Sequence, residues 1–84
     1  SNTYMIPNGT SAAASIATVS GLSKADKGRY NTLIGAGSDK PATIADGSTF
    51  VLEEGATWIA KTGASITFRI LDTTTLIEIS RTGA

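Results

Sequence analysis

The carboxylates are the only plausible catalytic groups in this chain of 84 residues, because it contains no histidine and no cysteine. Hydrolysis of a glycoside needs two carboxyl groups about 5–10 Å apart across the sugar. Glu53 and Glu54 are neighbours, but successive side chains of a strand point to opposite faces, so one strand cannot pair them. We therefore expect no enzyme and no catalytic residue. Turn or surface roles are expected for all seven acids, which are Asp26, Asp39, Asp46, Glu53, Glu54, Asp72 and Glu78.

Metal and cofactor sites are also not expected. Without cysteine and histidine the chain lacks disulfides, zinc knuckles and the commonest metal ligand. Asp39, Asp46 and Asp72 do not have the spacing of a calcium loop. The run Gly35-Ala36-Gly37 resembles part of a phosphate loop, but no Lys-Ser/Thr pair or helix follows it.

The charge and hydropathy of the chain exclude two further classes of partner. Seven basic residues balance seven acidic ones, and no basic cluster is present. Nucleic acid is not expected, because binding phosphates needs a concentrated positive field. No apolar run approaches the roughly 18 residues of a membrane span, and no signal peptide opens the chain, so membrane insertion is not expected.

Three aromatic residues are candidates for stacking on a sugar: Tyr4, Tyr30 and Trp58. Trp58 shares strand parity with Phe50 and Phe68, which favours packing in a core or between subunits. Tyr30 has the better chance of being exposed.

Glycines recur every eight residues in the second half of the chain. The repeated units are Gly47-Ser48-Thr49, Gly55-Ala56-Thr57 and Gly63-Ala64-Ser65. Each glycine follows a turn-tolerant residue, and Asp46-Gly47 is a strong tight-turn pair because glycine accepts positive φ. The segments between these turns are rich in aromatic and β-branched residues, which is typical of strands.

An even period keeps the parity of a strand from one unit to the next. The residues expected on one shared face are Phe50, Leu52, Trp58, Ala60, Ile66, Phe68 and Ile70. In the last strand, residues 76–80, Ile77 and Ile79 alternate with Glu78 and Ser80, and we expect the two isoleucines to be buried.

The pattern predicts an all-β protein with short strands in an antiparallel meander or sandwich, forming a single domain. Residues 1–28 are a segment rich in small residues with one or two short strands, and residues 29–84 form the meander module. A strand near Ile16 is favoured over a helix, because Gly21 would interrupt a helix there.

The core predicted for one chain is small. Leucine, isoleucine, valine and phenylalanine number eighteen of 84 residues, which is close to the roughly 20% below which disorder becomes common. We therefore expect copies to complete a shared interior, as an intertwined or side-by-side homotrimer. Its expected packing residues are Phe50, Leu52, Trp58, Ile66, Phe68, Ile70, Ile77 and Ile79.

Short motifs follow one another from about residue 16 onward. They are Lys27-Gly28-Arg29, Thr32-Leu33-Ile34-Gly35, Pro41-Ala42-Thr43-Ile44-Ala45-Asp46-Gly47-Ser48-Thr49-Phe50-Val51-Leu52, Gly55-Ala56-Thr57-Trp58 and Leu76-Ile77-Glu78-Ile79-Ser80-Arg81. This order resembles a β-module near the C-termini of bacteriophage tail fibres and tailspikes. Residues 72–78 depart from it, since they lack the glycine and tryptophan that many relatives carry in the last hairpin.

The resemblance implies a homotrimer in the virion that trimerises the fibre or attaches it to a receptor on the bacterial surface, such as a polysaccharide or an outer-membrane component. Because exposed loops carry recognition more often than strands do, residues 35–40 are the candidate receptor loop. Its candidate residues are Ser38, Asp39 and Lys40, with Tyr30 expected nearby. The alternative is a carbohydrate-binding β-sandwich module of a secreted bacterial enzyme, which would be a monomer with an exposed aromatic platform.

Overall fold

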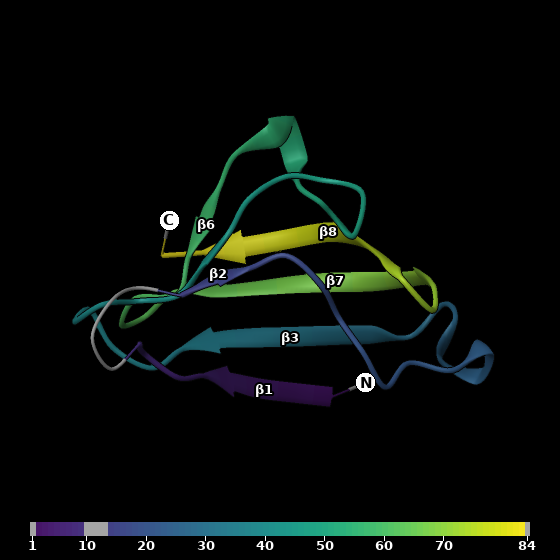
Figure 1. Ribbon diagram of the computed structural model, residues 1–84, viewed down its shortest axis with the longest axis horizontal. Helices are drawn as coiled ribbons and strands as arrows, with labels where there is room; N and C mark the ends of the chain where they lie inside the picture. Colours follow the sequence, from purple (N-terminus) through teal and green to yellow (C-terminus); the bar gives the residue numbers. More distant parts are fainter. Residues whose placement is uncertain (1, 10–13, 84) are drawn as a thin grey trace.

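Strands make up most of the regular structure in the computed structural model, which describes residues 2–9 and 14–83 (Figure 1). In chain order the elements are β1 (Asn2–Ile6), β2 (Ser15–Ile16), η1 (Lys24–Asp26), β3 (Tyr30–Gly35), β4 (Thr43–Ile44), β5 (Phe50–Val51), η2 (Glu53–Gly55), β6 (Trp58–Ile59), β7 (Ser65–Asp72) and β8 (Thr75–Thr82). The only helical elements in these ranges are the two three-residue 3-10 turns η1 and η2. The all-β prediction is confirmed.

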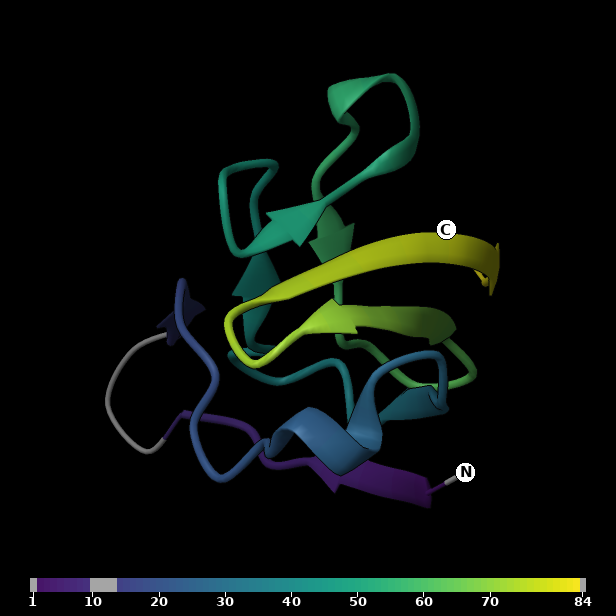
Figure 2. The same ribbon diagram turned by 90° about the vertical axis from the view of Figure 1, so that its right-hand side faces the viewer.

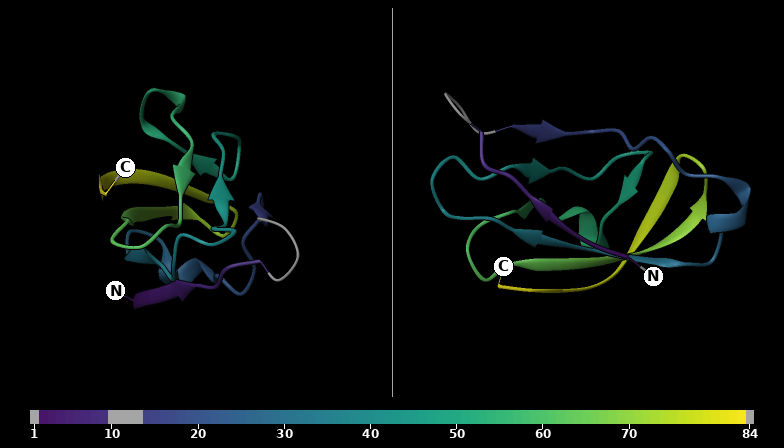
Figure 3. Two further views of the ribbon diagram at one scale, coloured as in Figure 1. Left: turned by 90° about the vertical axis from the view of Figure 1, so that its left-hand side faces the viewer. Right: turned by 90° about the horizontal axis from the view of Figure 1, so that it is seen from below.

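The strands form two sheets. The larger has five strands in the order β1-β3-β7-β8-β5, and the smaller has three in the order β2-β4-β6. In Figures 2 and 3 the small sheet and the segment that follows β2 lie on one face of the large sheet. Half-buried side chains of β2 and of that segment, namely Ile16, Val19 and Leu22, pack against the core between the two layers.

The strand pairing differs from the predicted meander of residues 29–84. β7 and β8 form an antiparallel hairpin, and they are the only consecutive strands that pair in the described part of the chain. The pairs β1/β3, β2/β4 and β5/β8 are parallel. β4, β5 and β6 have two residues each. β4 pairs antiparallel with β6 and parallel with β2, and β5 pairs with β8, so no two of the consecutive strands β4, β5 and β6 form a hairpin.

The core lies within one chain. All seven residues that parity places on one face are buried, namely Phe50, Leu52, Trp58, Ala60, Ile66, Phe68 and Ile70. The rings of Phe50 and Phe68 meet with their centroids 5.4 Å apart. Along β7, these apolar residues alternate with Ser65, Thr67 and Arg69 on the other face, as expected for a sheet with one covered face.

The glycine turns are stabilised in two different ways. Gly55 and Gly63 have φ of +69° and +81°, in the left-handed region that favours glycine. Gly47 is not among the residues with positive φ. Its turn is instead held by the Asp46 carboxylate, which accepts a hydrogen bond from the Leu52 backbone N–H at 2.8 Å.

Candidate functional site

A polar cavity of about 140 Å³ lies at the start of β3. Its walls come from β1, the segment after β2, η1, β3 and β7, and the lining residues are Tyr4, Gly21, Leu22, Asp26, Arg29, Tyr30, Asn31 and Ile70. Backbone pairing positions these elements. Gly28 N–H donates to the Ile70 carbonyl at 2.7 Å, and Ile70 N–H donates to the Arg29 carbonyl at 2.8 Å.

Asn31 is the buried polar residue of this cavity. It is 9% exposed and lies opposite Phe68 in the β3/β7 register, so its side chain is on the covered face of the large sheet. Asn31 lines the cavity, so its amide, which can both donate and accept hydrogen bonds, is a group that a ligand there would meet.

One acidic and one basic side chain line the same cavity. The Oδ2 atom of Asp26 accepts hydrogen bonds from the backbone N–H of Ser23 at 2.8 Å and from its hydroxyl at 3.2 Å. The backbone bond from Ser23 is the main cause that lowers the pKa of Asp26, and the charge of Arg29 lowers it further. Within the described residues, Oδ1 of Asp26 and the guanidinium of Arg29 make no hydrogen bond. The cavity thus presents an unused acceptor and an unused donor.

The predicted receptor residues are not in one place. Tyr30, which is 43% exposed, lines the cavity at the start of β3. Ser38, Asp39 and Lys40 follow Gly35, the last residue of β3. An extended strand of this length separates its ends by about 17 Å, so the expectation that Tyr30 lies near this loop is wrong.

Contacts with other segments of the same chain, and one contact between neighbouring side chains, hold the loop of residues 35–40. Lys40 has φ of +51°, and its carbonyl accepts a hydrogen bond from the Gly9 N–H at 3.0 Å. The ammonium of Lys40 lies 3.4 Å from Oδ1 of Asp39, whose side chain is 88% exposed. The Ser38 hydroxyl accepts a hydrogen bond from the Thr62 N–H at 3.4 Å.

The predicted packing residues divide into two groups. Six of them lie in the core of the single chain, namely Phe50, Leu52, Trp58, Ile66, Phe68 and Ile70. Ile77 is half-buried and Ile79 is 50% exposed. Within one chain the buried positions of β8 are Leu76 and Glu78, so the burial of Ile77 and Ile79 between copies stays a prediction.

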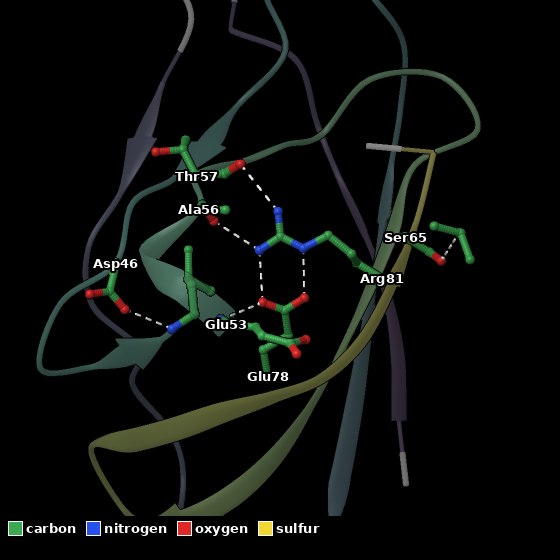
Figure 4. Close-up of polar contacts among 9 residues, drawn as sticks. Asp46, Glu53, Ala56, Thr57, Ser65, Glu78 and Arg81 are labelled. Atoms are coloured by element: carbon green, nitrogen blue, oxygen red, sulfur yellow. Dashed lines mark hydrogen bonds and ion pairs between the residues drawn. The ribbon is translucent and has the colours of Figure 1, made fainter.

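Glu78 and Arg81 form a polar cluster that the sequence did not predict (Figure 4). The guanidinium of Arg81 donates from Nε to Oε2 of Glu78 at 2.6 Å and from Nη2 to Oε1 at 2.7 Å. Oε1 also accepts a hydrogen bond from the Glu53 backbone N–H at 2.9 Å. Arg81 further donates to the carbonyls of Ala56 and Thr57. These contacts tie β8 to the segment from η2 to β6, which is a structural role.

Apolar side chains of β5 and β8 lie together at the surface. Val51 of β5 pairs with Ile77 in the register, and a surface hollow of about 290 Å³ is lined by Val51, Leu52, Glu53, Ile77, Glu78 and Ile79. Val51 is 36% and Ile79 is 50% exposed. We refer to Val51, Ile77 and Ile79 as the β5–β8 strip.

The remaining acids lie in short turns. Glu53 and Glu54 belong to η2, and Asp72 holds the β7–β8 turn by accepting a hydrogen bond from the Thr74 N–H at 2.8 Å. Within residues 2–9 and 14–83, no three side chains of the ligating types come together as a metal site would require. No helix in the same ranges has the length and apolar character to cross a membrane.

Sequence reasoning did not identify Asn31. The available signal was strand parity. Asn31 lies two residues before Leu33 in β3, so both side chains point to the covered face of the sheet. Comparison of the chain with family models, curated proteins and solved structures found no match.

Proposed function

We propose that the chain is a structural and host-attachment module of a bacteriophage tail fibre or tailspike, present in the virion as a homotrimer and without enzymatic activity. Its partners are two further copies of itself and a receptor on the bacterial surface, either a polysaccharide or an outer-membrane component. It takes no cofactor, binds no nucleic acid and does not insert into a membrane. The order of motifs along the sequence is the support for this family.

The β5–β8 strip is the observation that carries the assembly. Val51 and Ile79 are exposed, and Ile77, on the same strand as Ile79, pairs with Val51 in the register between β5 and β8. Contiguous exposed apolar side chains on a small domain mark an interaction surface. A second copy is the occupant that fits the proposal, since in a cyclic trimer the strip of each chain packs against another surface of the neighbouring copy.

The core of the single chain is already closed, which affects how such a trimer would form. Phe68 and Trp58 are 0% and 1% exposed without any partner chain. Copies therefore add to a folded chain through the strip, and they do not complete a shared core around Phe68.

The oligomeric state tests the proposal. Equilibrium sedimentation of the wild type over a wide concentration range is expected to give the mass of three chains. The combined substitution Val51→Ser and Ile79→Ser is expected to give monomers. Met5→Ser is the matched control, because Met5 is an exposed apolar side chain on β1, at the opposite edge of the sheet. A wild type that stays monomeric at high concentration would rule out the trimer.

The second candidate is a carbohydrate-binding β-sandwich module of a secreted bacterial enzyme. The closed core favours it: the single chain has 4938 Å² of accessible surface, close to the roughly 4,700 Å² typical of a folded monomer of this mass. A monomer with an intact fold would make this candidate the better one.

A further inference from the structure

We infer that the cavity at the start of β3 binds one neutral sugar residue, with Asn31, Asp26 and Arg29 as its polar contacts. This inference deepens the proposed attachment function, on which it rests, by naming the chemical class of the ligand and the side chains that hold it.

In the part of the chain that the structure describes, the buried polar residues are Asn31 and Glu78, and they differ in their surroundings. Glu78 accepts hydrogen bonds from Arg81 and from the Glu53 backbone, so its carboxylate is fully used. Asn31 has the same 9% exposure, but it lines the cavity. An amide in the wall of a polar cavity can donate one hydrogen bond to a ligand and accept another from it.

The charges of the cavity favour a neutral ligand. Among the described residues that line it, Asp26 and Arg29 are the charged ones, and their charges are opposite. An ionised carboxylate only accepts hydrogen bonds, a guanidinium only donates them, and an amide does both. A ring of hydroxyl groups can satisfy all three, since each hydroxyl both donates and accepts.

The size and apolar parts of the cavity fit one ring. About 140 Å³ is below the range of pockets for larger ligands, which begins near 300 Å³. Leu22 and Ile70 supply apolar wall. Tyr4 is 48% exposed and pairs with Leu33, which places its ring on the same face as Asn31. Tyrosine suits this position because it offers an apolar ring and a polar tip.

A second cavity adjoins the first and is mostly apolar. It has a volume of about 160 Å³, shares Tyr4 and Asn31 with the first cavity, and is also lined by side chains such as Ile16, Val19 and Leu33. We expect an N-acetylated or 6-deoxy sugar to bind more tightly than its plain counterpart, since its methyl group can enter this space.

Titration of the ¹⁵N-labelled full chain with single sugars, followed by NMR, tests the inference. The probes are methyl glucoside, methyl galactoside, N-acetylglucosamine and rhamnose, with glycine as a zwitterionic probe. Saturable shifts at the backbone amides of Arg29 and Asn31 are expected with at least one sugar. Arg29→Gln and Asp26→Asn should each weaken binding about tenfold or more, the effect of losing a hydrogen bond to a charged group.

The matched controls are Arg69→Gln and Asp72→Asn. Arg69 is an exposed arginine on β7, and Asp72 holds a turn as Asp26 does, but neither lines the cavity. Both controls should bind the sugar as the wild type does. The inference is overturned if no sugar shifts the cavity amides, if glycine alone shifts them, or if the controls weaken binding equally.

The trimer proposal and the sugar-site inference can be contradicted independently of each other. A chain that binds the sugar but sediments as a monomer would overturn the fibre proposal and support the sugar site. A trimer that binds none of the sugars would overturn the sugar site and leave the assembly standing.

Discussion

Glu78 and Arg81 lie three residues apart on β8, yet their side chains meet on the same face of the sheet, with Nε and Oε2 2.6 Å apart. Strict alternation would send residues at this spacing to opposite faces. The register accounts for the difference: Phe68 pairs with Glu78 and Thr67 pairs with Ser80, so Ile79 is an extra residue at a bulge. The bulge shifts the parity of β8 by one and makes the ion pair geometrically possible.

Removing Arg81 should be strongly destabilising. The Glu78 side chain is 1% exposed, so Arg81→Met leaves a buried carboxylate without its counter-ion, and we expect a loss of about 3–5 kcal/mol. The double variant Glu78→Leu with Arg81→Met should lose less than Arg81→Met alone, because no unpaired charge remains. Urea unfolding measures both.

Lys40→Met is the control for that experiment. Lys40 and Asp39 also form an ion pair, but their side chains are 39% and 88% exposed. We expect a change below about 1 kcal/mol, as for other exposed pairs. Equal losses for Lys40→Met and Arg81→Met would show that burial of the Glu78–Arg81 pair does not matter.

Stability should fall in acid because of the same carboxylate. The hydrogen bonds from Arg81 are the main cause that lowers the pKa of Glu78 below its ordinary value of 4.5, with the Glu53 N–H and the charge of Arg81 adding to them. A folded-state pKa below the unfolded one contributes stability above pH 4.5 that is lost as the pH falls through the folded-state pKa.

Unfolding measured from pH 7 to pH 3 checks this linkage. The free energy of unfolding of the wild type should decrease below about pH 4.5, and Glu78→Gln should flatten that decrease. Asp26 and Asp72 also have lowered pKa values, through backbone bonds from Ser23 and Thr74, and a shallow slope should therefore remain. An unchanged slope in Glu78→Gln would contradict the assignment.

The sequence was sufficient to predict which residues of the central strands are buried. Glycines at a period of eight keep the parity constant, so Phe50, Trp58 and Phe68 come to one face, and these residues are buried. The parity of β8 could not be predicted in the same way. A bulge depends on the ladder between two strands, and nothing at Ile79 itself indicates one.

The strand order and the cavity could not be predicted from the sequence either. The pairs β1/β3 and β5/β8 join segments about 25 to 30 residues apart in parallel, and no local turn signal marks such a pair. Asn31, Asp26 and Tyr4 come together only because β1 and η1 both pack beside the start of β3. Single-residue chemistry therefore identified Tyr4 and Tyr30 as candidates without locating the site.

Gly35 should be intolerant of any side chain. A Cβ atom there would lie 2.0 Å from the Lys61 carbonyl oxygen and 2.4 Å from the Ala60 carbonyl carbon, so the clash is with backbone. We expect Gly35→Ala to lose about 3 kcal/mol, at the upper end of the range for overpacking. Gly47→Ala is the control, since nothing lies within 4 Å of its Cβ position. Similar melting temperatures for both variants would contradict the close approach of β3 to residues 60–61.

Asn31→Leu should separate stability from binding. The substitution replaces the amide of a buried residue with an apolar side chain beside Phe68 and Leu33, and the adjoining cavities leave room for it. We expect the free energy of unfolding to rise by about 1 kcal/mol and sugar binding to be lost. Replacing a polar group that serves function by an apolar one often stabilises a protein in this way. Thermal unfolding and the NMR titration measure the two effects. A destabilised variant would show that the amide serves the fold.

Phe68→Ala should destabilise the single chain whatever its concentration. Phe68 is 0% exposed inside one chain and its ring contacts Phe50, so truncation should lose about 3–5 kcal/mol. Small domains hold only about 5–15 kcal/mol in total, and the variant should therefore melt far below the wild type even in dilute, monomeric solution. Ile79→Ser lies outside the core and should leave that dilute melting temperature unchanged while preventing association. Calorimetry over a dilution series distinguishes the two. If Phe68→Ala matters only at concentrations where chains associate, Phe68 is buried between copies, and the closed single-chain core is wrong.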